Sequence, residues 1–361
     1  MGSKKVVIAA GGTGGHIIPA LSVATELMKA GVQVLYVGNK NSMEQKLTSI
    51  HNIDFAEINV QKFYRKLTLA HIKFPFKLIK SILDSKKIIR KFNPDAFLGT
   101  GGFVSGPVGY AAHLLKIPIF LQEQNSFPGA TTKILSKYSK KIFLGNKNAN
   151  KYLPNNKTIY TGNPINQNAV LEKDAIDYIK LGLKPNTKKI FLFGGSQGSV
   201  VLNNTFLPII DDLLALGYEV IWQIGKYSFE EFYPKVKGKK GVYAFDFTNE
   251  IGKIYNSVDL AIARAGALSL AELETKKIPS ILIPLPSAAE NHQYYNAMEL
   301  KEKLVAELIE QKSLNSDELK EMIIRMLKNT DEIKKHFTSS IHADASKKIA
   351  DSIINYINKG E

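Results

Sequence analysis

Two side chains that can move a proton lie beside expected turns in the first half of this 361-residue chain. His16 follows the apolar run 6–10 and the turn GGTGG, where the first turn of a helix is expected. The glycines leave room for a ligand beside the ring, and a neutral imidazole can act as a general base. Glu123, in LQEQN after the apolar run 117–121, is a second candidate base. The alternatives are a buried structural histidine for His16, and a helix cap or an ion-pair partner for Glu123.

The second half of the chain offers side chains that suit a nucleoside diphosphate. Arg264 and Glu272 lie in ARAGALSLAELE, a strand–glycine–helix pattern. A guanidinium matches a diphosphate well. Glu272 lies about two helical turns further on, where its carboxylate could accept both hydroxyls of a ribose; a charge on the helix surface is the alternative. His292 and Gln293 begin another helix in NHQYYNA, where polar side chains often serve only as caps.

Three glycine-rich stretches follow expected strands, at residues 11–15, 98–107 and 194–199. Backbone N–H groups and a helix N-terminus together form an anion site. A dinucleotide fingerprint would need a glycine where Ile17 stands and an acidic residue after the next strand, which ends YVGNK, so an NAD-linked oxidoreductase is disfavoured. The chain has no Walker P-loop and no Asp-x-Asp pair, so we expect a site without a metal or other cofactor.

These residues must be positioned by strands and helices that alternate along the chain. Apolar runs predict strands near residues 4–10, 32–37, 95–98, 117–121, 141–145, 189–193, 218–222, 259–262 and 279–283. Helices are expected between them, for example over 16–30, 105–115, 200–216, 267–275 and 291–303. This alternation predicts an α/β fold with parallel, doubly wound sheets. Because KKIFLFGGSQGS repeats the pattern of KKVVIAAGGTGG, we expect two Rossmann-like halves, divided near residues 161–170, that bind ligands in a cleft.

The formal net charge of +15 is concentrated in one half of the chain. Residues 1–160 contain 23 Lys and Arg against 7 Asp and Glu, whereas residues 161–361 contain 25 against 26. Ten of the basic residues lie in 61–92, where Asp84 is the single acid and large apolar side chains are interleaved. This pattern favours an anionic membrane surface as the partner of residues 61–92, with an amphipathic helix packed on its sheet as the alternative. Nucleic acid is disfavoured because no binding motif is present.

Several other classes of protein are excluded or disfavoured by composition. The chain has no cysteine, which excludes disulfides and thiolate metal sites. Its N-terminus lacks a signal-peptide pattern, and no apolar run reaches the roughly 18–20 residues of a membrane-spanning helix.

Seven motifs together resemble the MurG family, in the order GGTGGHIIPA, TGGFVSGP, QEQN, GNP, GGSQGS, RAGALSLAEL and NHQYYNA. The resemblance covers essentially the whole chain and implies a GT-B glycosyltransferase, with two Rossmann-like domains that face a cleft. It implies that residues 1–163, completed by a returning helix at about 341–361, bind the lipid acceptor and the membrane, and that residues 164–340 bind UDP-GlcNAc.

The activity that the resemblance implies is an inverting, metal-independent transfer of GlcNAc. The donor would be UDP-GlcNAc, and the acceptor the C4 hydroxyl of MurNAc in undecaprenyl-pyrophosphoryl-MurNAc-pentapeptide, so that lipid I becomes lipid II in peptidoglycan synthesis. The family works peripherally at the cytoplasmic face of the bacterial cell membrane, and the excess of basic residues in the first half agrees with that location.

Site residues follow from the resemblance, motif by motif. His16 and Glu123 would be the candidate bases. Residues expected at the acceptor are Gly11, Gly12, Gly102, Ser105 and Gly106. Residues expected at the donor are Thr13, Gly14, Gly15, Asn125, Asn166, Ser196, Gln197, Asn203, Thr248, Arg264, Ala267, Leu268, Ser269, Leu270, Ala271, Glu272, His292 and Gln293.

The chain departs from the family pattern at four of these motifs. Gln122 stands where the family usually has His, Asn166 where it has Arg, Phe103 where Tyr is common, and His292 where it has Gln. An amide at position 122 cannot act as a base. The alternatives are another GT-B lipid glycosyltransferase, a UDP-GlcNAc 2-epimerase and a non-catalytic sugar- or lipid-binding protein, which an acceptor-dependent UDP-release assay would distinguish.

Overall fold

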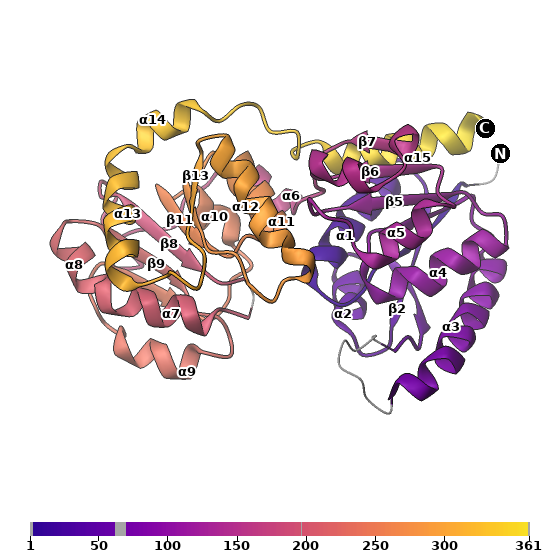
Figure 1. Ribbon diagram of the computed structural model, residues 1–361, viewed down its shortest axis with the longest axis horizontal. Helices are drawn as coiled ribbons and strands as arrows, with labels where there is room; N and C mark the ends of the chain where they lie inside the picture. Colours follow the sequence, from indigo (N-terminus) through magenta and orange to yellow (C-terminus); the bar gives the residue numbers. More distant parts are fainter. Residues whose placement is uncertain (1–2, 62–69, 196, 360–361) are drawn as a thin grey trace. The chain divides into compact units, whose positions relative to one another are not determined.

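The computed structural model describes residues 3–61, 70–195 and 197–359 of the chain (Figure 1). The chain forms two compact units, of which unit 1 comprises residues 1–166 and 341–361 and unit 2 comprises residues 167–340. Each unit contains one parallel sheet covered by helices, so the prediction of an α/β fold with two doubly wound halves is confirmed.

The sheet of unit 1 has the strand order β3-β2-β1-β4-β5-β6-β7, and its strand pairs are parallel. Its strands are β1 (Lys5–Ala9), β2 (Gln33–Asn39), β3 (Asp54–Ile58), β4 (Ala96–Gly99), β5 (Ile119–Glu123), β6 (Lys141–Leu144) and β7 (Thr158–Tyr160). Its helices are α1 (Gly14–Lys29), α2 (Met43–Ile50), α3 (Ala70–Phe92), α4 (Gly102–Leu114), α5 (Ala130–Ser136) and α15 (Ala345–Lys359).

Strand β1 shows how the sequence builds two cores in unit 1. Side chains alternate between the faces of a strand. Val6 and Ile8 therefore belong to a core that also contains buried residues of α1 and α15, whereas Val7 and Ala9 belong to a core with residues of α3 and α4. A strand buried on both faces reads as a continuous apolar run, which is why β1 was predictable.

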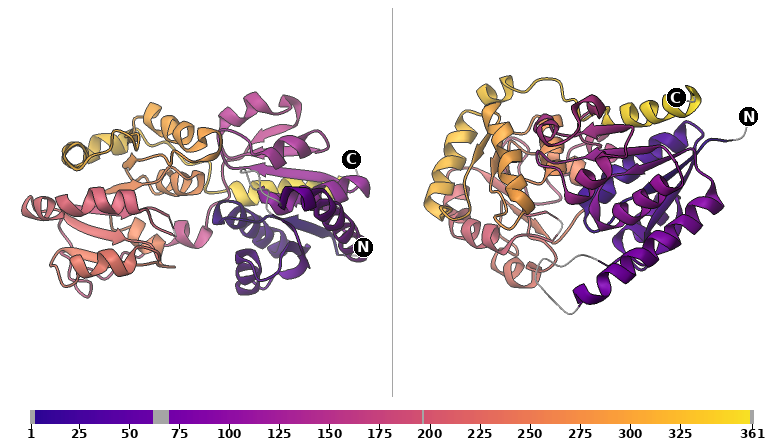
Figure 2. Two further views of the ribbon diagram at one scale, coloured as in Figure 1. Left: turned by 60° about the horizontal axis from the view of Figure 1, so that its bottom comes forward. Right: turned by 45° about the vertical axis from the view of Figure 1, so that its right-hand side comes forward.

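Helix α15 returns to unit 1 from the far end of the sequence (Figures 1 and 2). Its residues Ile349 and Ile353 are fully buried, in the same core as α1. The ring of Tyr356 meets Phe120 of β5 edge-on, with the ring centroids 5.3 Å apart.

The sheet of unit 2 has the strand order β10-β9-β8-β11-β12-β13, again with parallel pairs. Its strands are β8 (Lys189–Phe193), β9 (Glu219–Gln223), β10 (Val242–Phe245), β11 (Leu260–Ala263), β12 (Ser280–Leu282) and β13 (Ala306–Leu308). Its helices are α6 (Gln167–Leu171), α7 (Val200–Phe206), α8 (Ile210–Ala215), α9 (Phe229–Phe232), α10 (Ile251–Tyr255), α11 (Ala267–Thr275), α12 (His292–Glu302), α13 (Ser316–Lys328) and α14 (Thr330–Lys335).

The single helix expected over residues 200–216 is wrong. The segment instead forms α7, a 3₁₀ turn at Leu207–Ile209 and α8. Pro208 lies in that turn, and a proline lacks the N–H that a continuous helix would use there. The short strands β3, β7, β10 and β13 were not predicted. They are the edge strands of the two sheets, and most of their side chains are half-buried or exposed, so their sequences lack the fully buried runs of the central strands.

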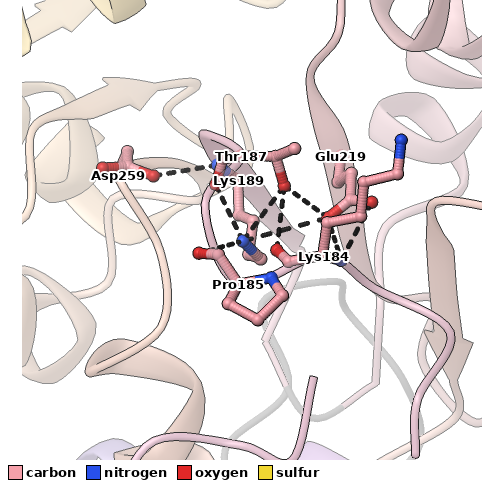
Figure 3. Close-up of polar contacts among 6 residues, drawn as sticks. All are labelled: Lys184, Pro185, Thr187, Lys189, Glu219 and Asp259. Carbon is pink, nitrogen blue, oxygen red and sulfur yellow. Dashed lines mark hydrogen bonds and ion pairs between the residues drawn. The ribbon is translucent and has the colours of Figure 1, made fainter. Parts of the chain in front are cut away.

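A buried polar cluster fixes the segment that enters β8 (Figure 3). The Lys189 side chain is 2% exposed, and its Nζ donates to the carbonyl oxygen of Thr187 at 2.7 Å and lies 3.8 Å from Glu219 Oε2. Glu219 also accepts hydrogen bonds from the Lys184 backbone N–H and the Thr187 hydroxyl. Asp259 accepts from the backbone N–H of Lys189 at 2.9 Å. The cluster lies at the amino end of β8, away from the loops that follow the strands.

Candidate functional site

In unit 1, the loops that follow β1, β4 and β5 lie at one edge of the sheet, because parallel strands share their carboxyl edge. Helix α1 begins there after Thr13, and α4 begins after Gly101, in both cases without a side-chain hydrogen bond that caps the helix. Uncapped helix N-termini present backbone N–H groups and a positive dipole end, which together favour an anion.

His16 lies in the first turn of α1 and is half-buried. Its Nδ1 lies 3.0 Å from Oε1 of Gln124, in the loop after β5. The ring packs on Gly101, where a Cβ would lie 2.7 Å from His16 Nδ1. The neighbouring Gly12, Thr13 and Gly15 are exposed, so one side of this loop faces solvent.

Glu123 has a different environment. It is 2% exposed, and its Oε1 accepts from the backbone N–H of Asn125 at 3.1 Å while its Oε2 accepts from the N–H of Gly129 at 3.1 Å. The Asn125 side chain donates to the same carboxylate at 3.3 Å. Glu123 thus organises the loop between β5 and α5, and the geometry favours His16 as the base candidate.

The residues predicted at the acceptor differ in burial: Gly12 is exposed, Gly102 and Gly106 are half-buried, and Gly11 and Ser105 are buried. Ser105 is fully buried, and its hydroxyl contacts the carbonyl oxygens of Ala9 and Gly101. Gly102 has φ +78°, and a Cβ there would lie 1.9 Å from the carbonyl oxygen of Gly11. These three residues therefore support the packing of α4 against the loop after β1, and their contact with an acceptor stays a prediction, as does that of Gly12 and Gly106.

Strand β9 and the residues that follow it support the glycine loop after β8. Gln223 donates from Nε2 to the carbonyl oxygen of Gly195 at 3.0 Å. Gly198 and Gly225 have φ +81° and +91° and approach so closely that a Cβ on Gly225 would lie 2.2 Å from Gly198 Cα. Gln197 is exposed on this loop, whereas the predicted Ser196 lies outside the described residues.

Asn203, which was predicted to contact the donor, contributes to the core of unit 2. It is 1% exposed, and its Oδ1 accepts from Trp222 Nε1 at 3.1 Å while its Nδ2 donates to the carbonyl oxygen of Ile224 at 3.0 Å. Both ends of the amide therefore tie α7 to β9, beside the glycine loop.

Arg264 follows β11 and carries its charge in a buried setting. It is 9% exposed, and burial lowers the pKa of its guanidinium to about 10. NH2 donates to the Ser199 hydroxyl at 2.8 Å and to Gln311 Oε1 at 2.7 Å, and NH1 donates to the carbonyl oxygen of Ile283 at 3.1 Å. Because these partners are neutral oxygens, they orient the cation without cancelling its charge.

Glu272 lies on α11, which begins after Gly266 without a side-chain cap. The hydroxyl of Tyr255 donates to Glu272 Oε2 at 2.9 Å. Tyr255 is 3% exposed, and burial and the negative charge of Glu272 raise its pKa well above the usual value. Tyr255 therefore stays a neutral donor that orients the carboxylate, a role that sequence reasoning missed because Tyr255 lies in no motif.

Four further predicted donor residues lie on three other segments. Thr248 accepts from the backbone N–H of Glu250 at 3.0 Å. His292 Nδ1 lies 2.7 Å from the carbonyl oxygen of Ala289, and Gln293 Oε1 accepts from the backbone N–H of Leu285 at 2.9 Å. The contact of Thr248 shapes the loop after β10, and those of His292 and Gln293 shape the loop after β12. Donor contacts of these three residues remain predictions, as does that of the half-buried Asn166.

An apolar cavity of about 480 Å³ lies between α3, α4 and α5 in unit 1. Its lining includes Leu78 and Ile82 of α3, Tyr110 of α4 and Ile134 of α5. On the outer side of α3, Phe76, Ile79 and Leu83 are 75%, 57% and 52% exposed. Residues 62–69 of the predicted basic and apolar patch lie outside the described residues.

Among residues 3–61, 70–195 and 197–359, every helix is too short or too polar to span a bilayer. Within these same ranges, His, Cys, Asp and Glu side chains do not gather in groups of three or more that could hold a metal ion.

Comparison with known families assigns both halves of the sequence. The glycosyltransferase family 28 N-terminal domain matches residues 6–144, and the glycosyltransferase family 28 C-terminal domain matches residues 189–353. The UDP-N-acetylglucosamine--N-acetylmuramyl-(pentapeptide) pyrophosphoryl-undecaprenol N-acetylglucosamine transferase of Flavobacterium psychrophilum is 37% identical over 366 aligned positions, which cover 99% of each chain. The transferase of the same name from Bacillus subtilis is 35% identical and covers 91% of this chain and 92% of the relative.

Solved structures agree with these matches. MurG of Acinetobacter baumannii superposes with a TM-score of 0.77 at 27% identity, covering 98% of this chain and 99% of that one. UDP-GlcNAc 2-epimerase of Neisseria meningitidis, bound to UDP-GlcNAc, superposes with a TM-score of 0.70 at 16% identity over 97% of this chain and 100% of that one. At that identity the epimerase shows a shared fold alone.

Proposed function

The chain belongs to the MurG family, within glycosyltransferase family 28, and from this premise we propose that it transfers GlcNAc from UDP-GlcNAc to the C4 hydroxyl of MurNAc in undecaprenyl-pyrophosphoryl-MurNAc-pentapeptide. The observation that carries the proposal in the structure is the pair Arg264 and Glu272 beside the carboxyl edge of the sheet in unit 2. Sequence identity of 37% and 35% to the two transferases, over 99% and 91% of this chain, favours this reaction over the 2-epimerase alternative.

We assign donor binding to unit 2. Arg264 would meet the diphosphate, because its charge is oriented by neutral partners and charge-assisted hydrogen bonds to phosphate are strong. The uncapped N-terminus of α11 adds N–H groups and a dipole of the right sign. Glu272, oriented by Tyr255, would accept hydrogen bonds from the ribose hydroxyls.

We assign acceptor binding and proton removal to unit 1. His16 Nε2 would take the proton of the C4 hydroxyl as its oxygen attacks the anomeric carbon of the donor. The bond between that carbon and the diphosphate oxygen breaks in the same step, UDP leaves with the electron pair, and the configuration inverts. Arg264 and the helix N-terminus would stabilise the departing diphosphate. The uncapped starts of α1 and α4 suit the diphosphate of the lipid acceptor.

The test is UDP release from UDP-GlcNAc with a short-chain lipid I analogue, in the presence and absence of EDTA. We expect acceptor-dependent release that EDTA leaves unchanged, and a protein that releases no UDP with this acceptor would contradict the proposal. His16→Gln is expected to lower kcat about 10²- to 10⁴-fold with UDP affinity within about twofold. If His16→Gln turns over at the wild-type rate, His16 is not the general base, and the proposal that the protein transfers GlcNAc still stands.

We also propose that unit 1 binds the cytoplasmic face of an anionic membrane peripherally, through α3. Phe76, Ile79 and Leu83 are spaced by three and four residues, which places them on one face of the helix. Lys80 and Lys87 are exposed on the same helix. Large apolar side chains among lysines suit the boundary between lipid headgroups and acyl chains.

Vesicle co-sedimentation tests this part of the proposal. The triple variant Phe76→Ser, Ile79→Ser and Leu83→Ser should bind vesicles that contain anionic lipid about tenfold or more weakly, because it removes three apolar side chains from the contact. Ile179→Ser and Leu216→Ser change side chains in unit 2 that are 80% and 55% exposed, and they serve as controls expected to bind normally. Equal binding by the triple variant and the controls would exclude α3 as the membrane face.

A further inference from the structure

A chain of buried amides leads from His16 into the interior of unit 1. Gln124 Oε1 lies 3.0 Å from His16 Nδ1, and Gln124 Nε2 donates to the carbonyl oxygen of Thr100 at 2.7 Å and to Gln122 Oε1 at 2.5 Å. Gln122 Nε2 in turn donates to Asn163 Oδ1 at 3.2 Å, and Asn163 Nδ2 donates to the carbonyl oxygen of Gln124 at 3.1 Å.

Backbone carbonyls determine which end of each side-chain amide in this network is the oxygen and which is the NH₂ group. A carbonyl oxygen can only accept a hydrogen bond, so the carbonyl of Gln124 requires the NH₂ group of Asn163 and the carbonyl of Thr100 requires that of Gln124. Asn163 then presents Oδ1 to Gln122, which must present its NH₂ there and its Oε1 to Gln124. The carbonyl of Thr100 and the Oε1 of Gln122 therefore both require the NH₂ group of Gln124, and its acceptor oxygen faces His16.

From this geometry we infer that Gln124 is a positioning residue that holds His16 with its proton on Nδ1. An acceptor oxygen at 3.0 Å is satisfied only by an Nδ1–H donor, and the neutral ring then carries its lone pair on Nε2. The inference rests on the proposed function, in which Nε2 takes the proton of the acceptor hydroxyl. The tautomer itself is a separate property of the ring and can be measured without any substrate.

The packing around the amides supports a fixed network. Gln122, Gln124 and Asn163 are 0%, 2% and 3% exposed, so water competes little for their hydrogen bonds. Two glycines make room for them: a Cβ at Gly101 would lie 2.7 Å from His16 Nδ1, and one at Gly145 would lie 1.9 Å from Asn163 Oδ1. The backbone N–H of Asn163 donates to His342 Nδ1 at 2.8 Å, which ties the far end of the network to the segment before α15.

The primary experiment is ¹⁵N NMR of the full-length protein with labelled histidine, near neutral pH and without substrate. His16→Gln identifies the resonances of the His16 ring by their loss. We expect a protonated Nδ1 and an unprotonated Nε2 in the wild-type protein. A ring protonated on Nε2 instead would overturn the inference, whatever the activity of the enzyme.

Variants at Gln124 test whether this residue determines the tautomer of His16. Gln124→Met removes the acceptor, so the His16 ring is expected to move toward the Nε2–H form that predominates in water, and kcat should fall about 10- to 100-fold with the KM for UDP-GlcNAc within about twofold. Gln124→Glu replaces the NH₂ group that donates to the Thr100 carbonyl by an oxygen, so the carboxyl is expected to keep a proton on that side. Its other oxygen still accepts from Nδ1–H, so this variant should retain the Nδ1–H form.

Thr100→Val is the matched control. Thr100 donates from Oγ1 to the carbonyl oxygen of His16 at 2.7 Å, so this variant removes a partly buried hydrogen bond to the same histidine but keeps the carbonyl that orients Gln124. It should be less stable than wild type and retain the wild-type tautomer. If Gln124→Met keeps the Nδ1–H form, or if Thr100→Val loses it as well, Gln124 has no specific positioning role. If the tautomer behaves as expected but His16→Gln remains active, the inference stands and the base assignment falls.

Discussion

At the scale of single residues, the two units hold their chemical groups in different ways. Arg264 is a buried cation oriented by neutral oxygens, and Glu272 is a carboxylate oriented by the hydroxyl of Tyr255. His16 is a half-buried ring oriented by the amide of Gln124. In each case the proposed functional group has a neutral partner, so its own charge or lone pair remains available for a substrate.

Arg264→Gln should weaken UDP binding about 10- to 100-fold at pH 8, because it removes a charge-assisted contact with the diphosphate. The pKa of Arg264 is about 10, lowered by burial, so the guanidinium loses its proton as the pH rises through that value. The advantage of wild type over the variant should therefore be constant up to about pH 9 and shrink above pH 10. Calorimetry or a competition assay across this pH range measures the ratio of the UDP affinities of wild type and variant. The ionisation of uracil does not change this ratio, because it affects binding to both proteins equally.

Two outcomes would contradict different parts of this prediction. Equal UDP affinities at pH 8 would show that the side chain does not meet the donor. A ratio that stays constant through pH 10.5 would show that the guanidinium keeps its proton there, which contradicts the lowered pKa and leaves the contact with the diphosphate in place. The thermal midpoint of Arg264→Gln is the control, since the guanidinium also bridges backbone carbonyls after β12.

The sequence singled out the proposed functional residues but not the side chains that orient them, even though one of these, Gln124, stands inside the motif QEQN. His16, Arg264 and Glu272 each follow a glycine turn, so local pattern was sufficient to find them. Gln124 and Tyr255 reach their partners across 108 and 17 residues of sequence, and no local pattern signals such pairs. Gln122, which departs from the family pattern, is buried in the amide network rather than facing a ligand.

At the scale of elements, strands were predictable where both faces are buried. β1, β4, β5 and β8 are apolar runs at the centre of their sheets, whereas β7 and β13 are three-residue edge strands with few apolar residues. Edge strands bury less surface, so their sequences are under weaker constraint. The entry to β8 is an exception, because a buried polar cluster rather than apolar packing fixes it (Figure 3).

Glu219→Gln should lower the free energy of unfolding by about 3 kcal/mol at pH 7.5, because it leaves the buried charge of Lys189 without its carboxylate. Burial lowers the pKa of Lys189 below its usual value, so the unfolded chain binds more protons between the folded and unfolded pKa values. The free energy of unfolding therefore rises with pH through that window, and it rises more steeply in the variant. The difference in this free energy between wild type and variant should shrink as the pH approaches 10.5. Urea denaturation of both proteins at pH 7.5 and pH 10 measures this difference.

Glu332→Gln provides the control for this prediction. It removes a carboxylate that pairs with Lys335 on the surface, where both side chains are about 70% exposed. Such pairs contribute little, so unfolding should be unchanged at either pH. A loss of stability in Glu219→Gln that does not depend on pH would point to the hydrogen bonds of Lys184 and Thr187 instead of the lysine charge.

At the scale of the whole molecule, the chain passes from unit 1 to unit 2 after Asn166 and returns after Ser340. The first passage was visible in the sequence, because Gly and Pro interrupt the pattern near residues 161–170. The return was inferred only by resemblance, since the amphipathic pattern of residues 343–357 does not say which sheet the helix covers. We propose that acceptor and membrane binding belong to unit 1, including α15, and donor binding to unit 2.

If α15 belongs energetically to unit 1, weakening it should loosen that unit alone. The double variant Ile349→Ala and Ile353→Ala removes two fully buried side chains from the core shared with α1, at a cost of roughly 2–5 kcal/mol each. Hydrogen exchange should then accelerate in peptides from β1 and α1, while peptides from β8 and β11 keep their protection. Ile323→Ala, in the core of unit 2, is the matched control and should give the reverse pattern. Equal loss of protection in both units from either variant would mean that the two units unfold together and that the division does not describe the energetics of the chain.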